Sequence, residues 1–247
     1  MRPLELPTQE TLSFTLRHLP SAPARILEVG CGAGELALQL KRLGHQIVPI
    51  DSSVEAAEQA KELGVEVTIA RWPQFEDRPF DAVLFTRSLH HIHPLREAVE
   101  QAHRLLKPSG LVVVEDFAYE EAVLSTIEWF YGVLSLLETC GKLSLENDSF
   151  AKTLLTSKGS FEVWRNRHDE DVNLASSMAI VLKEWFEPLA EASATYLYRY
   201  LCPLLEDGDD GYVIVRRVLE MEERLASTGA VNLIGRRFVG RRKPIGS

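Results

Sequence analysis

Short apolar runs alternate with longer amphipathic segments through the first half of the chain. Runs of this length, flanked by polar turns, are typical of strands buried in a sheet. They predict strands over residues 24–29, 46–50, 65–70, 80–86 and 111–115. The segments between them carry apolar residues at helical spacing and predict helices over residues 8–19, 35–43, 53–63 and 94–106. Gly44 and Gly64 each follow one of these helices, where a left-handed cap is common.

Strands separated by single helices imply parallel pairing through crossover connections, with helices on both faces of the sheet. The alternation stops over residues 119–186, which are mainly helical and rich in aromatic side chains. It resumes with expected strands at 193–201 and 230–239 around a helix at 213–225. The pattern predicts an α/β fold in one domain, residues 1–247, with a doubly wound, mostly parallel seven-stranded sheet. Residues 119–186 are a helical insertion after its fifth strand.

Three glycines lie on alternate positions directly after the first expected strand, in the stretch ILEVGCGAGELA. Gly30, Gly32 and Gly34 therefore occupy the turn into the first helix of the sheet. Glycine takes positive φ without strain and lets a ligand lie against the backbone. In open α/β sheets, ligands bind at this end of the strands. The glycines predict a ligand site here, although a tight turn alone also uses one or two glycines.

Two carboxylates frame this turn. Glu28 lies two residues before Gly30, and Asp51 ends the second expected strand. A carboxylate at a strand end can accept both hydroxyls of a ribose, because it offers two acceptor oxygens. Asp51 also suits the N-cap of the following helix, and the two roles are compatible. A nicotinamide-binding fingerprint reads G-x-G-x-x-G/A, but Glu35 stands where its third small residue belongs.

Charge and composition exclude several kinds of partner. The formal net charge is −9, which argues against a general nucleic-acid binder, although five basic residues gather at 236–243. That cluster is either a solvated strand end or a contact for an acidic or phosphorylated substrate. The three scattered cysteines fit a reducing compartment, and neither a signal core nor a run long enough to span a bilayer is present. These features predict a cytoplasmic protein with no membrane partner.

Four segments together resemble a known family. ILEVGCGAGELA resembles the first motif of the class I, seven-strand S-adenosylmethionine-dependent methyltransferases, and VPIDSS resembles their second-strand motif. FDAVLFTRSLHHI and LLKPSGLVVVED are similar to their fourth- and fifth-strand motifs. The order and spacing agree over residues 25–116. The resemblance implies a Rossmann-like fold, S-adenosylmethionine as cofactor and methyl transfer as the activity.

The resemblance also implies a role for each matching position. Glu28 would hold the cofactor's ammonium group, directly or through water, and Asp51 with Ser52 would bind the ribose. The remaining cofactor contacts would come from three places: the glycine turn, the end of the third strand and the end of the fourth. These residues are Gly30, Cys31, Gly32 and Gly34, then Ala70, Arg71 and Trp72, then Thr86, Arg87 and Ser88. Many relatives place an acid beside the adenine, and this sequence has none at residues 70–71. Trp72 either covers the ring or packs in the core.

Three histidines follow the fourth strand in SLHHIHP. Methyl transfer to a hydroxyl is helped by a general base, and histidine suits neutral pH. His90 and His91 are therefore candidate catalytic residues, while His93 lies at a helix boundary before a proline. A metal site is an alternative if HDED, residues 168–171, supplies more ligands. The alternative for HDED is a purely structural role, as a polar loop that caps the next helix through Asp171 or Asn173.

The insertion at 119–186 is expected to cover the substrate, because it follows the fifth strand and carries nine Phe, Tyr and Trp residues in mixed polar surroundings. The expected acceptor is a small molecule methylated at oxygen, nitrogen or carbon. Two other hypotheses stay open: a non-catalytic methyltransferase-like binding protein and an NAD-dependent oxidoreductase. The absent adenine acid mildly favours the first of these, and the glycine spacing disfavours the second.

Overall fold

The computed structural model of the 247-residue chain describes residues 1–146, 148–168 and 171–244. Contacts between residues divide these into two compact units. Among the described residues, the sheet unit contains 10–116, 173–192 and 236–244, and the helical unit contains 1–9, 117–146, 148–168, 171–172 and 193–235. Each unit is described separately below.

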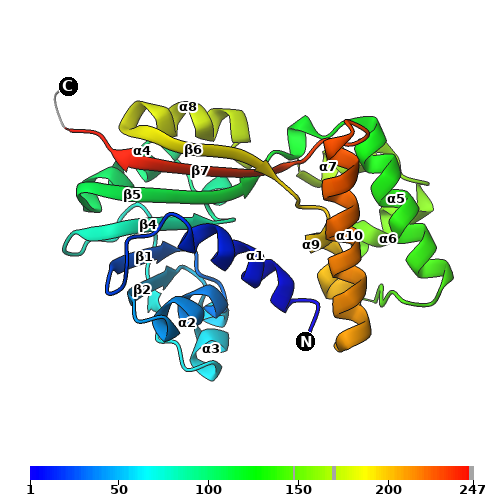
Figure 1. Ribbon diagram of the computed structural model, residues 1–247, viewed down its shortest axis with the longest axis horizontal. Coiled ribbons are helices and arrows are strands. Elements are labelled where there is room, and N and C mark those ends of the chain that lie inside the picture. The colour runs from blue at the N-terminus through cyan, green and yellow to red at the C-terminus, as the bar shows by residue number, and fades with distance from the viewer. Residues whose placement is uncertain (147, 169–170, 245–247) are drawn as a thin grey trace. The chain divides into compact units, whose positions relative to one another are not determined.

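The sheet has seven strands in the order β3-β2-β1-β4-β5-β7-β6 (Figure 1). Pairing is parallel from β3 to β5, and β7 runs antiparallel between β5 and β6, so the sheet is mixed. The strands are β1 (Arg25–Val29), β2 (Gln46–Asp51), β3 (Thr68–Ile69), β4 (Phe80–Thr86), β5 (Leu106–Phe117), β6 (Phe186–Ala194) and β7 (Gly235–Arg242). The predicted seven-stranded α/β fold is confirmed. Strand order reverses at β1, with β2 on one side and β4 on the other.

Helices cover both faces of this sheet. Phe14 of α1 (Glu5–Leu16) and Leu36 and Leu40 of α2 (Glu35–Arg42) pack with inward side chains of four strands. Strand residues alternate between faces, so the neighbouring buried side chains point to the opposite side. On that opposite face of the sheet, α4 (Leu95–Leu105) contacts α8 (Ala175–Trp185). Among the elements of this unit, α3 (Val54–Glu62) packs beside α2 through Ala60.

Local sequence explains where these helices begin and end. Ser53 is the N-cap of α3, because its hydroxyl accepts a hydrogen bond from the Ala56 N–H at 3.1 Å. The alternative N-cap role for Asp51 is therefore wrong. Gly44 and Gly64 have φ of 90° and 78°, as the predicted left-handed caps require. The cap of α8 is Leu174, without a side-chain hydrogen bond, so the expectation of Asp171 or Asn173 there is also wrong.

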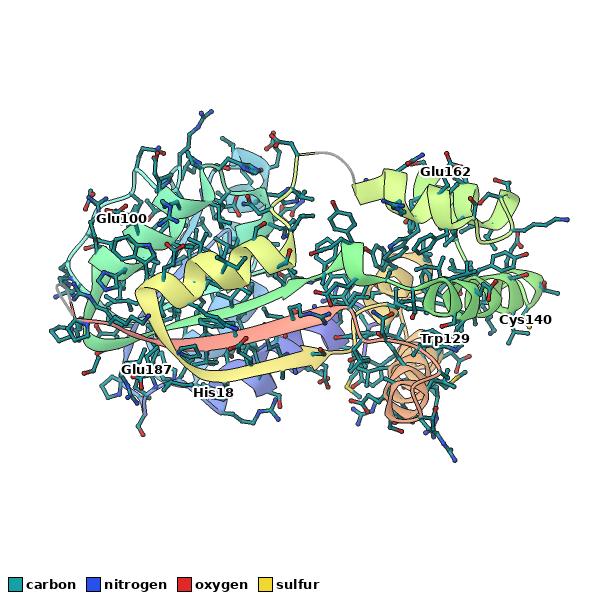
Figure 2. All side chains as sticks on the ribbon, turned by 90° about the horizontal axis from the view of Figure 1, so that it is seen from above. His18, Glu100, Trp129, Cys140, Glu162 and Glu187 are labelled. Carbon is teal, nitrogen blue, oxygen red and sulfur yellow. The ribbon has the colours of Figure 1, made fainter. Side chains whose placement is uncertain are left out.

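The helical unit contains α5 (Leu124–Thr139), α6 (Ser149–Thr156), α7 (Phe161–His168), α9 (Tyr198–Leu201) and α10 (Asp209–Ser227), with 3₁₀ turns η2 (Tyr119–Glu121) and η3 (Cys202–Leu204). In Figure 2, α5 carries Trp129 and Cys140 lies at its end, while Glu162 lies on α7. The core of the helical unit is apolar and aromatic, with Phe130, Trp164 and Tyr198 fully buried. No described helix in either unit is both long and apolar enough to cross a membrane.

The last part of the sheet departs from the sequence prediction. The prediction of a strand at 193–201 is wrong. β6 spans Phe186–Ala194, and the tyrosine-rich residues that follow it form α9. The buried Glu222 carboxylate accepts hydrogen bonds from the backbone N–H groups of Tyr196 and Leu197, which fixes a helical start there. β6 is mostly exposed and contains Pro188, so as an edge strand it lacks the usual strand pattern.

Candidate active site

A cavity of about 660 Å³ opens at the carboxyl ends of β1, β2, β3 and β4 in the sheet unit. The sequence predicted nine of its lining residues as cofactor contacts. They are Gly30, Gly32, Asp51, Ser52, Ala70, Arg71, Trp72, Arg87 and Ser88, and the catalytic candidate His91 is a tenth. The cavity lies where the strand order reverses, as expected for ligand sites in open α/β sheets.

The three glycines of the turn all have positive φ, at 70°, 55° and 77°, but only one faces open space. A Cβ on Gly30 would lie 2.5 Å from the Ser88 Cβ, and one on Gly34 would lie 3.2 Å from Ala60. A Cβ on Gly32 would meet nothing within 4 Å. Gly30 and Gly34 therefore permit close packing, whereas Gly32 keeps its part of the cavity free of a side chain.

The Asp51 carboxylate turns toward this glycine. Its Oδ2 accepts a hydrogen bond from the Gly32 N–H at 2.9 Å, and its Oδ1 accepts one from the Ser53 N–H at 2.9 Å. Two backbone bonds fix the carboxylate plane and leave further lone pairs on both oxygens. Asp51 lines the cavity, so these lone pairs are available to a pair of hydroxyl donors.

Glu28 is buried beside the glycine turn rather than in the described cavity wall. The Thr86 hydroxyl donates to its Oε1 at 3.3 Å, and its buried Oε2 has no hydrogen-bond partner among the described residues. Burial raises the pKa of Glu28 to about 8, against the opposing effects of Thr86 and Arg87. A buried carboxylate oxygen without a donor is costly, and a cationic ligand group would relieve that cost.

Trp72 packs against its neighbours and also borders the cavity. Its indole N–H donates to the Ala98 carbonyl at 3.0 Å, and its ring meets Phe85 edge to face at 5.8 Å. The same side chain lines the cavity, together with Arg71 and Gln74. Gln74 was not predicted, and its side-chain amide offers an acceptor where the sequence lacks an acid.

The two candidate histidines occupy different positions. His91 is exposed and lines the cavity, whereas His90 is buried and is absent from the described lining. His90 Nδ1 lies 2.7 Å from Asp116 Oδ1, and the rings of His90 and His91 are 3.9 Å apart at their centroids. Asp116 was missed as a site residue, although its place at the carboxyl end of β5 was a usable signal.

Of the other predicted site residues, Cys31 and Thr86 are not part of the cavity lining. Cys31 is buried, and burial raises the pKa of its thiol far above the ordinary value, so the thiol stays protonated. Thr86 acts on Glu28, as described above. Arg87 lines the cavity with φ of 63°, a left-handed conformation that non-glycine residues rarely adopt.

Neither alternative site from the sequence gains support. Among the residues that the structure describes, no group of three or more His, Cys, Asp or Glu side chains could hold a metal. Asp169 and Glu170 of the HDED segment lie outside the described residues, as does the His168 side chain. In the basic cluster, Arg237 pairs with Glu115 at 2.7 Å, and Arg241 pairs with Glu187 at 3.4 Å.

These residues fit an adenosyl sulfonium ligand. The backbone at Gly32 is open, Asp51 presents acceptors to hydroxyl donors, and Glu28 has a buried oxygen to which no residue in the described part of the chain donates. The cavity volume also suits a ligand of that size.

Residues 7–152, more than half of the chain, match a family model described as a methyltransferase domain. The chain belongs to the class I methyltransferase family. The chain is 33% identical over 118 residues to a ubiquinone biosynthesis O-methyltransferase of Xanthomonas oryzae pv. oryzae. The match covers 44% of the chain and 49% of that relative, so the chain spans about half the length of the curated relatives it matches.

Solved structures share the fold of this chain. The N-methyltransferase NodS from Bradyrhizobium japonicum WM9, in complex with S-adenosyl-L-homocysteine, has a TM-score of 0.52 at 13% identity, covering 96% of this chain and 87% of NodS. A protein named the [4+2]-cyclase SpnF has a TM-score of 0.56 at 20% identity, covering 96% of this chain and 82% of SpnF. At these identities the likeness shows the fold alone, and the cyclase shows that this fold serves more than one chemistry.

Proposed function

We propose that this methyltransferase transfers a methyl group from S-adenosylmethionine to a small organic acceptor. The observation that carries the proposal is the joint geometry of Gly32 and Asp51. One leaves the backbone open to the cavity, and the other points a fixed carboxylate into the same space. When bound, the cofactor supplies an activated methyl group on a sulfonium, so positioning accounts for much of the catalysis.

Each lining residue has a proposed part in holding the cofactor. Asp51 and Ser52 bind the ribose hydroxyls, and Glu28 balances the ammonium group from behind the glycine turn. Trp72 and Arg71 border the adenine, and Arg87 lies toward the methionine end. Gly30, Cys31 and Gly34 shape the turn, and Thr86 orients Glu28 through its hydrogen bond.

The acceptor class is proposed from the relatives and the sequence. The curated relatives are named O-methyltransferases, which favours oxygen over nitrogen or carbon as the methylated atom. Residues 119–186 are the proposed source of acceptor contacts because of their aromatic content. The three cysteines form no disulfide, which supports the proposed cytoplasmic location.

Replacing Asp51 by alanine should weaken the binding of S-adenosylhomocysteine at least tenfold, or about 1.4 kcal/mol. The variant loses both ribose acceptors and frees the Gly32 N–H. Isothermal titration calorimetry of the parent chain should show binding in the range of about 1 μM to 1 mM. Asp207→Ala, which removes an exposed carboxylate from the helical unit, is the matched control and should bind like the parent.

The same titration separates the proposed function from its alternatives. No heat with S-adenosylhomocysteine, or equal binding by the Asp51 variant, contradicts the proposal. Binding of NAD instead would favour an oxidoreductase. Binding of S-adenosylhomocysteine without transfer of radiolabelled methyl to any component of a metabolite extract would favour a non-catalytic binding protein.

A further inference from the structure

The short 3₁₀ turn η1 (Leu89–His91) is held to the sheet by a buried carboxylate. Asp116 Oδ1 lies 2.7 Å from His90 Nδ1, and Asp116 Oδ2 accepts the His90 backbone N–H at 3.2 Å. Both side chains are almost fully buried. The paired contacts fix both the backbone and the ring of His90, since a carboxylate that accepts from two directions allows little rotation.

Asn173 holds the opposite side of the same turn. Its side-chain amide donates to the carbonyls of Leu89 at 3.0 Å and Ile92 at 2.9 Å, and its backbone N–H donates to the His90 carbonyl at 2.8 Å. These bonds add to a bond within the turn, in which the Ile92 N–H donates to the Leu89 carbonyl at 3.2 Å. Asn173 comes more than 80 residues after the turn, so its role is set by the fold and not by local sequence.

The turn therefore presents His91 to the cavity in a fixed place. The His91 ring packs on the His90 ring, yet no described residue donates to or accepts from its imidazole nitrogens. Burial and the neighbouring His90 lower the pKa of His91, Asp116 opposes them, and His93 adds a smaller lowering. Arg87 lines the same cavity. His91 is therefore neutral near pH 7 and carries a free lone pair.

Resting on the methyl transfer proposed above, we propose that His91 is the proton acceptor for a phenolic hydroxyl on the substrate. Asp116 and Asn173 act as positioning residues for it. A ring nitrogen of His91 takes the hydroxyl proton, and the oxygen keeps the electron pair with which it bonds the methyl carbon. S-adenosylmethionine held at Gly32 and Asp51 would supply the methyl carbon, and the electron pair of the broken carbon–sulfur bond would be left on sulfur. The imidazolium then releases its proton to water, so the step balances without an oxidant or reductant.

The chemistry of His91 favours a phenol over other acceptors. A neutral amine attacks with its own lone pair and needs no base beforehand. A phenol has a pKa of about 10, within reach of an imidazole, whereas an aliphatic alcohol is a far weaker acid. A well-placed general base contributes about 100-fold or more to such a reaction.

The first test measures His91 in the ligand-free 247-residue chain by NMR titration of its ring nitrogens. Its pKa should lie below the ordinary histidine value, and Asp116→Asn should lower it further by removing the negative charge. If the pKa of His91 were the same in Asp116→Asn as in the parent, the proposed coupling between Asp116 and His91 would be wrong. Because Asp116 is buried, its variant can fail to fold, so a second test uses His91 directly.

The second test uses 4-nitrocatechol, whose visible absorption changes when its hydroxyl ionises, with the complex of the chain and S-adenosylhomocysteine. The parent complex should ionise the bound probe below the pH at which the free probe ionises. His91→Gln should abolish this shift, Asn173→Ala should reduce it at least threefold, and His18→Gln, in the turn that follows α1, should leave it unchanged. No shift in the parent, or an equal shift in His91→Gln, overturns the proposal. Calorimetry on the same samples reports separately whether S-adenosylhomocysteine binds, which tests the proposed function itself.

Discussion

Replacing Glu28 by glutamine should remove a loss of stability that the ligand-free parent suffers as pH rises. Burial raises the pKa of Glu28 from its ordinary value of 4.5 to about 8 in the folded chain. Below pH 4.5 the group is protonated in both the folded and unfolded states, so its favourable contribution is fully present. Between pH 4.5 and about 8 only the unfolded chain ionises freely, and the contribution is lost as pH rises through this window.

The expected effect is about 1.4 kcal/mol per pH unit, on the order of 5 kcal/mol across the window. Urea unfolding at pH 5, 6.5 and 8 measures it as the difference in slope between the parent and Glu28→Gln. The slope is the informative quantity, because any fixed cost of burying the amide is the same at each pH. Glu58→Gln, on the exposed face of α3, is the matched control and should keep the parent's slope.

The same substitution should weaken the binding of S-adenosylhomocysteine. In the parent, an ammonium group beside Glu28 favours the ionised carboxylate, so binding at pH 7 should release a proton. Calorimetry in phosphate and in Tris, which differ in ionisation enthalpy, detects that release. Glu28→Gln should show weaker binding and no release. Parallel stability curves for the parent and the variant, or equal proton release, would show that Glu28 is not the buried acid described here.

The sequence predicted local features best where a residue type serves a single structural purpose, as glycine does at positive φ. Gly30, Gly32 and Gly34 were expected to need positive φ, and all three have it. The position of Asp51 followed from the rule that parallel strands place their carboxyl ends on one edge of a sheet. The same rule applied to β5 points to Asp116, which sequence analysis passed over. What local pattern cannot supply is the difference between Gly32, which faces open space, and Gly30, which packs on Ser88.

Other features could not be predicted because distant residues decide them. Asn173 belongs to the site through three hydrogen bonds to a turn far away in sequence. The tyrosine-rich segment reads as a strand, but the Glu222 carboxylate binds its backbone N–H groups and starts a helix. Tertiary contacts override strand propensity in this way most easily where the competing edge strand has few buried side chains.

Two glycine substitutions should separate the packing role of the turn from its ligand role. Gly30→Ala and Gly32→Ala both place a side chain at positive φ, which costs about 1 kcal/mol each. Only Gly30→Ala also drives a Cβ to within 2.5 Å of the Ser88 Cβ, whose hydroxyl donates to the Val29 carbonyl. Overpacking of this kind costs about 1–3 kcal/mol more.

Gly30→Ala should therefore lower Tm by about 5–15 °C and Gly32→Ala by only about 2–4 °C, for a chain of this size. Relative to the stability that each variant loses, Gly32→Ala should weaken ligand binding more than Gly30→Ala. The reason is that the methyl group added at position 32 enters the cavity. Thermal unfolding with and without S-adenosylhomocysteine measures both effects. Gly32→Ala should lose most of the ligand-induced rise in Tm, and Ser88→Gly should restore stability to Gly30→Ala by removing the clashing Cβ. A Gly32→Ala chain that the ligand stabilises as well as the parent would mean that nothing binds against this backbone.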